Sequence, residues 1–498
     1  MTDLIDLELF VSDAPTGRAL VLPLSDGQWR SLLEDGHRHV DAGDHRRLRD
    51  LAELTRFQAN AGQTLTSLTE DGRRLTVVGL GSVATTVALR EAVATAMSEL
   101  PDGSAFEWSV VVPPRDPGGA DVAELLRAAA EGALLGGYRF GPKRGAKVEA
   151  PGPCTLVTGL TGSEATAIAA RARALCEGVV LARDLINTPA QDLGPQELSD
   201  AAVAVAERHG MRARVLRGAE VEEHEFRLVA AVGRAADRPA TVTIIEGGPE
   251  GADPVIGVVG KGVVFDTGGL DLKTGGSMQL MRKDMGGAGT VIGALEAFGR
   301  LGGDTPFLAV IPAAENAIGP AAMRPGDVLR SMDGLTVEIG NTDAEGRLLL
   351  ADGLTWARRQ GVPRLLDVAT LTGAARVALG PDFPALFGND EALVEDLRRR
   401  SIEHDEELWR MPLVDRYESW IDSPFADVNN AGSDRRAGAI TAALFLRRFA
   451  RDTPWAHVDL YAWEDRGRPG TPRGANGMEV RTVAEALAGA GGLASAQS

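Results

Sequence analysis

The apolar positions of the chain form short runs that alternate with longer stretches of helical spacing. In the first half, an apolar strand at Leu75–Val78 leads through the turn Gly79–Gly81 into a helical stretch at Thr86–Leu100, which is typical of an α/β unit. From Thr161 the apolar residues recur every three or four positions until Pro189, which forces the residue before it out of helical geometry. The pattern therefore predicts one long helix between two α/β halves.

The second half repeats the alternation of strands and helices. Its apolar strand candidates lie at Ala213–Leu216, Val242–Glu246, Val255–Val259, Phe307–Ile311, Leu365–Ala369 and His457–Leu460. Such an alternation predicts a mostly parallel central sheet flanked by helices, with ligands at the carboxyl ends of the strands. The expected fold class is α/β, with a smaller N-terminal α/β domain (1–160), a linking helix (161–190) and a larger C-terminal α/β domain (191–498).

Length, composition and charge narrow the class of protein. The chain has 498 residues, 44% apolar and 24% charged, which suits a globular protein of two or three domains. Its formal charge of −18 repels phosphate backbones and anionic lipids, so neither nucleic acid nor a membrane is an expected partner. The acidic start is unlike a signal peptide, and no apolar run approaches the ~20 residues that span a bilayer, so a cytoplasmic location is expected.

The histidine and glycine patterns disfavour two kinds of site, a histidine-based metal site and a nucleotide-binding turn. None of the seven histidines belongs to an HExxH or other two-histidine pattern, so a metal site would be built mostly from oxygen. The Gly79–Gly81 turn could seat a phosphate, but it lacks a third glycine and a ribose-binding acid, which disfavours a nucleotide site.

Carboxylates gather where the predicted strands end. After Val255–Val259 and before the helix Leu348–Arg358 the chain carries Asp266, Asp284, Asp343 and Glu345 beside several glycines. Four carboxylates packed together would repel one another and be pushed toward protonation, whereas two divalent cations bound by their oxygens remove the repulsion. The same acids also suit helix N-termini as ordinary first-turn residues, and spacing alone leaves that alternative open.

Lysine is rare in this chain, and its positions favour a metal site over ordinary first-turn acids. Only five of the 52 basic residues are lysine, namely Lys143, Lys147, Lys261, Lys273 and Lys283. Lysine can lose its proton and donate a lone pair to a metal, whereas arginine cannot. Lys261, between two glycines, is therefore a candidate metal ligand, and Lys273 is a candidate electrophile for a substrate carbonyl. Lys283 is interpreted as a solvated neighbour.

Two blocks of sequence resemble a known family. NTDAEGRLLLADGL, from Asn341 to Leu354, resembles the signature of the leucyl aminopeptidase (cytosol aminopeptidase) family almost letter for letter, and GKGVVFDTGGLDLK, from Gly260 to Lys273, resembles its companion block. The resemblance continues through RPGDVL, DVATLTGA, FADVNNAG and AGAITA, and more faintly through ALLGGYRF. It spans about 79–457, and the first 75 residues match no pattern that we recognise.

The resemblance implies a metal-dependent aminopeptidase with a catalytic C-terminal domain and two divalent cations per chain, Zn²⁺ or Mn²⁺. One cation would be held by Lys261, Asp266, Asp284 and Glu345. The other would be held by Asp266, Asp343 and Glu345, with the Asp343 carbonyl. A hydroxide activated by both cations would then attack peptides that have a free N-terminal amine.

The resemblance also implies roles for residues outside the metal ligands. Lys273 would polarise the scissile carbonyl, and Arg347 would hold a bicarbonate ion that serves as general base. The substrate-binding residues would be Met281, Asn341, Thr370, Leu371 and Gly373, and the chain would form a homohexamer.

The chain departs from the family pattern after Trp455–Leu460. Relatives continue with a small glycine-threonine-alanine segment before a tryptophan, whereas this chain has Tyr461-Ala462-Trp463 and then the Pro/Gly-rich 464–474. That segment borders the side-chain pocket in relatives, so the preference for leucine is open. Two other functions are alternatives: a phosphatase-type dinuclear hydrolase, which would need more cationic side chains around the phosphate, and a non-catalytic binding scaffold on the same fold.

Overall fold

The computed structural model describes residues 8–17, 19–98, 107–115, 119–141, 152–160, 162–434 and 436–495. Thr161, Lys143 and Lys147 lie outside these ranges. The chain divides into two compact units, Met1–Val180 with Asp465–Arg473, and Leu181–Glu464 with Gly474–Ser498. The boundaries at 160 and 190 that we expect from the sequence stay a prediction.

The first unit is built on a six-stranded sheet in the order β1-β6-β5-β2-β4-β3, parallel except for the pair β3 and β4. Its strands are β1 (Leu9–Ser12), β2 (Ala19–Leu24), β3 (Thr64–Leu68), β4 (Arg74–Gly79), β5 (Trp108–Val111) and β6 (Cys154–Val157). Its helices are α1 (Asp26–Asp35), α2 (Ala42–Thr55), α3 (Thr86–Ser98) and α4 (Val122–Gly136). The α/β unit expected at 75–100 is present as β4 followed by α3, although residues 99 and 100 lie outside the described ranges.

The long helix expected after residue 160 is α5 (Gly162–Asn187), which ends two residues before Pro189. Pro189 lacks the N–H that would continue the helix and restricts Thr188 before it. No helix among the described residues is long and apolar enough to cross a bilayer.

The second unit contains a nine-stranded sheet in the order β16-β15-β18-β14-β9-β11-β8-β7, with β10 paired to β11. The strands are β7 (Arg212–Arg217), β8 (Thr241–Gly247), β9 (Gly257–Gly260), β10 (Gly262–Asp266), β11 (Phe307–Asn316), β14 (Leu365–Ala369), β15 (Ala385–Gly388), β16 (Trp409–Arg410) and β18 (Trp455–Asp459). The central strands β18, β14, β9, β11 and β10 run parallel, while β15, β8 and β7 run antiparallel to their inner neighbours. The mostly parallel sheet expected from the sequence is therefore confirmed.

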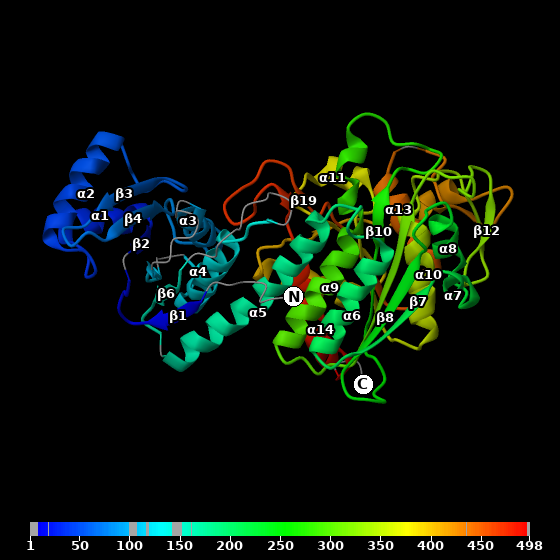
Figure 1. The fold of residues 1–498 in the computed structure, drawn as a ribbon, viewed down its shortest axis with the longest axis horizontal. Helices are drawn as coiled ribbons and strands as arrows, with labels where there is room; N and C mark the ends of the chain where they lie inside the picture. Colours follow the sequence, from blue (N-terminus) through cyan, green and yellow to red (C-terminus); the bar gives the residue numbers. More distant parts are fainter. Residues whose placement is uncertain are drawn as a thin grey trace. The chain divides into compact units, whose positions relative to one another are not determined.

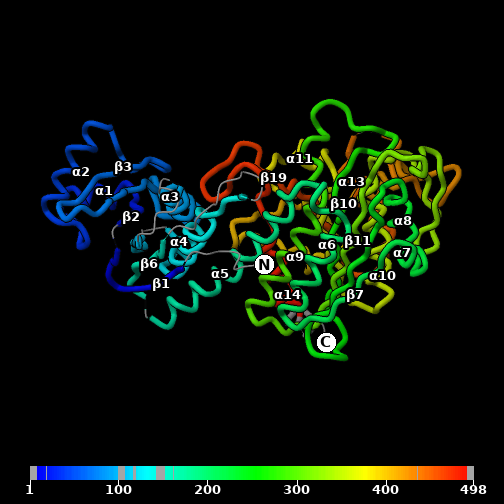
Figure 2. The backbone as a smooth tube through the Cα atoms, in the orientation of Figure 1, coloured from blue at the N-terminus to red at the C-terminus, as the bar shows by residue number. Residues whose placement is uncertain are grey.

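Helices cover both faces of this sheet (Figure 1). One face packs against α6 (Pro195–Arg208) and α9 (Gly286–Arg300), with α14 (Val480–Ser495) on α9. The other face packs against α8 (Arg227–Gly233) and α10 (Gly346–Arg359), with α13 (Gly438–Ala450) on α10 (Figure 2). Both faces of the central strands are buried, which explains why their sequences are continuous apolar runs.

Shorter elements complete the unit. They are α7 (Ala219–Glu223), α11 (Gly373–Leu379), α12 (Glu391–Glu403), the 3₁₀ helices η1 (Ser277–Met285) and η2 (Asp415–Ile421), and the short strands β12 (Val328–Arg330), β13 (Thr336–Glu338), β17 (Val428–Asn429), β19 (Trp463–Glu464) and β20 (Gly474–Ala475). The helix that we expect to begin at Met285 is α9, and η1 precedes it directly.

Candidate metal centre

The carboxyl ends of the central parallel strands carry the polar residues that the sequence singled out. β9 ends directly before Lys261, β10 ends at Asp266, and β14 ends directly before Thr370. Asn316, the last residue of β11, is the register partner of Asp266. Because parallel strands end at the same edge of a sheet, these residues from four strands meet at one place.

The remaining acids reach the same edge from helix termini. Asp284 lies near the end of η1, and Asp343 and Glu345 lie in the turn directly before α10. Oxygens of Asp266, Asp343 and Glu345 lie within 4.8 Å of one another. Asp266, Asp284 and Glu345 are buried, and the Asp343 side chain is 32% exposed. The acids thus form one mostly buried cluster in which Asp343 is the most exposed member.

Lys261 closes the buried end of the cluster. Its Nζ lies 2.7 Å from Asp284 Oδ2 and 3.3 Å from Glu345 Oε1, and it donates a hydrogen bond of 2.9 Å to the Thr370 carbonyl. At Gly346, the first residue of α10, a Cβ would lie 2.4 Å from Lys261 Cε. Glycine at this position therefore lets the lysine side chain pass close to the helix backbone.

Lys273 lies at the more open end. Its Nζ is 2.7 Å from Asp266 Oδ2 and 2.5 Å from Asp343 Oδ1, and its side chain is 13% exposed. The two lysine ammonium groups therefore lie on either side of the carboxylates. Each one supplies positive charge at a point where several acidic oxygens converge.

The pKa values show how strongly the cluster attracts positive charge. Burial lowers the pKa of Lys261, but the carboxylates of Asp284, Glu345 and Asp266 outweigh burial and raise it above its ordinary value. Burial raises the pKa of the Glu345 carboxyl, and the charge of Asp266 raises it further. The same two causes raise the pKa of Asp343. Acids that hold protons this firmly would also attract other cations.

The donor set fits divalent cations. Asp284 Oδ2 and Asp343 Oδ1 are buried and accept no well-directed hydrogen bond from the described residues, although each lies close to a lysine ammonium. A metal ion at either oxygen would therefore compete only with a lysine ammonium group. A set of four carboxylates and one amine from fixed elements suits a hard or borderline divalent ion.

Arg347 lies in the first turn of α10 but does not contact the carboxylates directly. Its Nη1 donates a hydrogen bond of 2.6 Å to the Asn430 carbonyl, and burial lowers the pKa of its guanidinium to about 10. Its buried Nε has no hydrogen-bond partner among the described residues. A buried guanidinium with an unused N–H suits a small planar anion.

Two of the five expected substrate-binding residues form hydrogen bonds with the acids of the cluster, and the other three do not. Thr370 Oγ1 donates a hydrogen bond of 2.8 Å to Asp284 Oδ1, and Asn341 Oδ1 accepts one of 2.8 Å from the Asp343 amide. Leu371 lies on the loop after β14, and its amide donates a hydrogen bond of 2.9 Å to Asp459 Oδ1. Met281 is half-buried on η1, and Gly373 is exposed at the start of α11. Thr370 and Asn341 are thus tied to the acids, whereas the other three lie on surrounding segments.

Two asparagines that support the cluster were not identified from the sequence. Asn316 Nδ2 donates to Asp266 Oδ1 at 2.8 Å and to the Thr342 carbonyl at 3.1 Å. Asn430 Oδ1 accepts from the Gly340 amide at 2.8 Å, and its Nδ2 donates to the Asn341 carbonyl at 2.7 Å. Together they fix the Asp266 carboxylate and the turn that carries Asp343 and Glu345. The motif FADVNNAG contains Asn430 and could have identified it from the sequence. For Asn316 the only signal was its position shortly after the predicted strand that begins at Phe307.

The interpretation of Lys283 as a solvated neighbour was wrong. Lys283 is 6% exposed, its ammonium lies 4.6 Å from the centre of the Tyr461 ring, and burial lowers its pKa to about 8. The 3₁₀ geometry of η1 turns it toward the segment that follows β18, a direction that local sequence spacing does not reveal.

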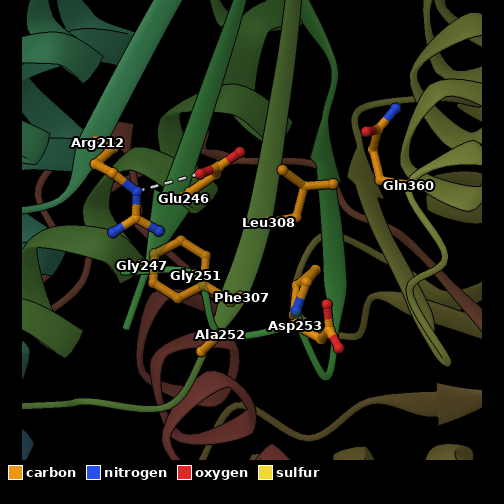
Figure 3. Close-up of a pocket in the computed structure, with 10 residues that line it drawn as sticks. Arg212, Glu246, Gly247, Gly251, Ala252, Asp253, Phe307, Leu308 and Gln360 are labelled. Atoms are coloured by element: carbon orange, nitrogen blue, oxygen red, sulfur yellow. Dashed lines mark hydrogen bonds and ion pairs between the residues drawn. The ribbon is translucent and has the colours of Figure 1, made fainter. Parts of the chain in front are cut away.

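A cavity of about 240 Å³ lies elsewhere in this unit, where β8 ends and β11 begins (Figure 3). Arg212 Nε lies 3.2 Å from Glu246 Oε2 on its wall, and Asp253, Phe307 and Gln360 also line it. None of the site residues expected from the sequence lines this cavity.

Two family models match the chain. The catalytic-domain model of the cytosol aminopeptidase family matches residues 180–484, and the N-terminal-domain model of the same family matches 29–144. The match therefore begins before residue 79 and extends beyond 457. The first 75 residues thus do include sequence of this family, although they carry no motif that we recognise.

Individual relatives match over nearly the whole chain. A probable cytosol aminopeptidase of Geobacter sp. (strain M21) is 39% identical over 88% of this chain and 90% of its own length. The crystal structure of the cytosol aminopeptidase from Coxiella burnetii matches with a TM-score of 0.83 and 34% identity, over 96% of this chain and 98% of that chain. The bottromycin maturation enzyme BotP in complex with Mn matches with a TM-score of 0.84 and 35% identity, over 94% and 98%.

These matches agree with the mixed α/β architecture and with the acidic cluster at the ends of the central strands. The chain belongs to the cytosol aminopeptidase family and is a metal-dependent hydrolase of the aminopeptidase type.

Proposed function

We propose that this chain removes the N-terminal residue from peptides with a free amine, at a centre of two divalent cations. The observation that carries the proposal is the convergence of Asp266, Asp343 and Glu345 within 4.8 Å, with a lysine ammonium on either side. Clustered carboxylates of this kind are stable only when cations or protons balance their charge.

The proposed ligand sets share two carboxylates. One cation is assigned to Lys261, Asp266, Asp284 and Glu345, and the other to Asp266, Asp343 and Glu345 with the Asp343 carbonyl. When bound, a pair of divalent cations lowers the pKa of water enough to supply hydroxide at neutral pH. The metal is proposed to be Zn²⁺ or Mn²⁺, and the relative that was solved with Mn supports testing manganese first.

Lys273 and Arg347 are proposed to act on the substrate and on the general base. With its carboxylate partners engaged elsewhere, Lys273 donates to the oxygen of the scissile carbonyl as negative charge develops there. Arg347 would hold bicarbonate through its unused Nε–H, while its Nη1 donates to the Asn430 carbonyl and so fixes the guanidinium. A bicarbonate ion held there would supply a general base for the proton of the attacking water.

The N-terminal residue of the substrate is proposed to lie against the segments around the acids. Its side chain contacts Met281, Thr370, Leu371 and Gly373, and Asn341 borders the scissile bond. The chain is further proposed to be cytoplasmic, on the names of its relatives, and to form a homohexamer. Light scattering that gives a mass near 52 kDa for an active preparation would contradict the hexamer.

The deciding experiment compares free and N-acetylated aminoacyl anilides, with Mn²⁺ or Zn²⁺ and after chelation. We expect release of the chromophore from the free-amine substrates only, because the amine is proposed to occupy a metal position that an acetylated amine cannot take. Elemental analysis of the same samples should give two metal ions per chain. Comparable hydrolysis of the acetylated substrates would contradict the aminopeptidase mechanism.

A further inference from the structure

Lys283 is a buried cation without an acidic partner. It is 6% exposed, and the described residues give its ammonium neither an ion pair nor a hydrogen bond. The two acids whose charges act on it, Asp284 and Asp459, are already engaged. Asp284 contacts Lys261 and Thr370, and Asp459 accepts hydrogen bonds from the segment after β14. An unpaired charge in such a place is costly, so it calls for an explanation.

A second cation lies against the same aromatic ring. The guanidinium of Arg376 lies 4.7 Å from the centre of the Tyr461 ring, and its Nη1 donates a hydrogen bond of 2.8 Å to Tyr461 Oη. The ammonium of Lys283 lies 4.6 Å from the centre of that ring. Two positive groups thus flank one tyrosine. The described residues supply no carboxylate in contact with either of them.

Lys283 and Arg376 stand on the two segments that are proposed to hold the side chain of the substrate, and Tyr461 stands on the segment that departs from the family pattern. Lys283 follows Met281 on η1, Arg376 lies on α11 just after the Thr370–Gly373 loop, and Tyr461 follows β18. The segments meet closely, because a Cβ at Gly286 would lie 2.5 Å from Ala462 Cβ and 2.9 Å from Thr370 Cγ2. Tyr461 also stands where the family pattern has small residues.

The position of Lys283 distinguishes the two ends of the centre. The charges that act on the Lys283 ammonium are those of Asp284, Lys261, Asp459 and Arg376, and Asp284 contacts Lys261 at the buried end. Lys273, the proposed partner of the scissile carbonyl, contacts Asp266 and Asp343 at the other end. Lys283 therefore lies at the Asp284 end of the cluster, the end to which the N-terminal residue of the substrate and its side chain are assigned here.

We propose that Lys283, with Arg376 at the rim, binds the side-chain carboxylate of substrates whose N-terminal residue is glutamate or aspartate. The proposal rests on the proposed aminopeptidase function and specifies its substrate class. A substrate carboxylate that reaches the ammonium gives it the ion pair that the described residues do not provide. A leucine side chain would leave the charge buried and unpaired.

The test compares α-glutamyl and α-glutaminyl p-nitroanilides, because the two side chains have the same size and differ in charge. A charge-assisted contact predicts a kcat/KM for the glutamyl substrate about 10- to 100-fold above that for the glutaminyl substrate. Lys283→Met should bring this ratio to about 1 or below, and Lys283→Arg should keep it above 1. Arg212→Met, which removes a cation at the distant cavity of Figure 3, should keep the wild-type ratio.

The outcomes separate this inference from the function on which it rests. A wild-type ratio at or below 1, with rapid hydrolysis of leucyl or methionyl anilide, would overturn the acidic specificity and leave the aminopeptidase function standing. A wild-type preference that Lys283→Met retains in a folded protein would also overturn the role of Lys283. Failure to hydrolyse every free-amine anilide with either metal would overturn the proposed function itself.

Discussion

Lys261→Arg tests whether the buried lysine is a metal ligand or an ordinary cation. A lysine can coordinate only after it loses its proton, and arginine cannot lose its own. In the structure, the carboxylates raise the pKa of Lys261, because they outweigh the effect of burial. Divalent cations bound to the same carboxylates would reverse that balance and favour the neutral amine. Arginine would keep its charge in both situations.

The size of the effect follows from the distances. Lys261 Nζ lies 2.7 Å from Asp284 Oδ2 and 3.3 Å from Glu345 Oε1, so a cation held by these oxygens would be within ~4 Å of a guanidinium. A unit charge and a doubly charged ion at that separation repel by about 8 kcal/mol at an effective dielectric constant of ~20. Even a quarter of this energy weakens binding by roughly 30-fold. The guanidinium is also larger, and the lysine already passes so close to α10 that a Cβ at Gly346 would lie 2.4 Å from its Cε.

The assay is elemental analysis after dialysis, alongside turnover of a free-amine anilide. We expect Lys261→Arg to lose one of the two metals and most of the activity. Lys273→Arg is the matched control, because the lysine at 273 is proposed to remain charged. This control should keep both metals, and its turnover should fall by ~10²- to 10³-fold if the role matches that of an oxyanion donor. Two metals per chain and near-normal turnover in Lys261→Arg would refute the assignment of the ligands.

Three further predictions concern a hydrogen bond to a carboxylate of the metal centre, the release of protons on metal binding, and the stability of the buried core. Asn316→Ala removes the amide donor to Asp266, so metal affinity measured by titration should fall ~10- to 100-fold, and unchanged affinity would contradict its supporting role. Binding of Mn²⁺ at pH 7 should release protons, and affinity should rise from pH 6 to 8, because the raised pKa values of Glu345 and Lys261 keep protons on the metal-free centre. Calorimetric heats that are identical in buffers of different ionisation enthalpy would contradict this. Asp352→Ala leaves the buried amides of Leu228 and Met332, 2.7 and 2.9 Å from the carboxylate, without an acceptor, and should lower the free energy of unfolding by about 2–5 kcal/mol in a denaturant titration. A denaturation midpoint equal to that of the wild type would contradict it.

The strands that form the centre of the sheet could be predicted because burial on both faces makes them continuous apolar runs. The predicted strand Leu365–Ala369 has the bounds of β14, and Phe307–Ile311 forms the first half of β11. β10 was missed because Lys261 separates its apolar residues from those of β9, and the pattern is typical of one strand followed by a loop. β10 instead pairs with β11, which runs on beyond its pairing with β9.

Site residues that stand in contiguous motifs could be predicted from the sequence. Residues whose role depends on contacts with distant parts of the sequence could not. Asn430 reaches the Asn341 carbonyl across 89 positions of sequence, so no local spacing connects the two. The prediction for Lys283 failed for a similar reason. Its surroundings are set by Tyr461, and a lysine beside two other charged residues looks solvated until the fold is known.

Two lysines of one cluster are proposed to have different roles, Lys261 as a neutral metal ligand and Lys273 as a charged donor. The difference in their burial accounts for this proposal. Both Lys261 and Lys273 contact two carboxylates, and these carboxylates raise the pKa of both. Lys261, however, is enclosed by the start of α10 and the loop after β14, and its side chain is 3% exposed, against 13% for Lys273. A closed position next to cations favours the neutral amine that can act as a ligand. A position with a path to solvent leaves Lys273 charged and able to meet a carbonyl that enters from outside. The difference in enclosure therefore supports the proposed division of roles. Exchanging each lysine for arginine should affect metal content at position 261 and turnover at position 273.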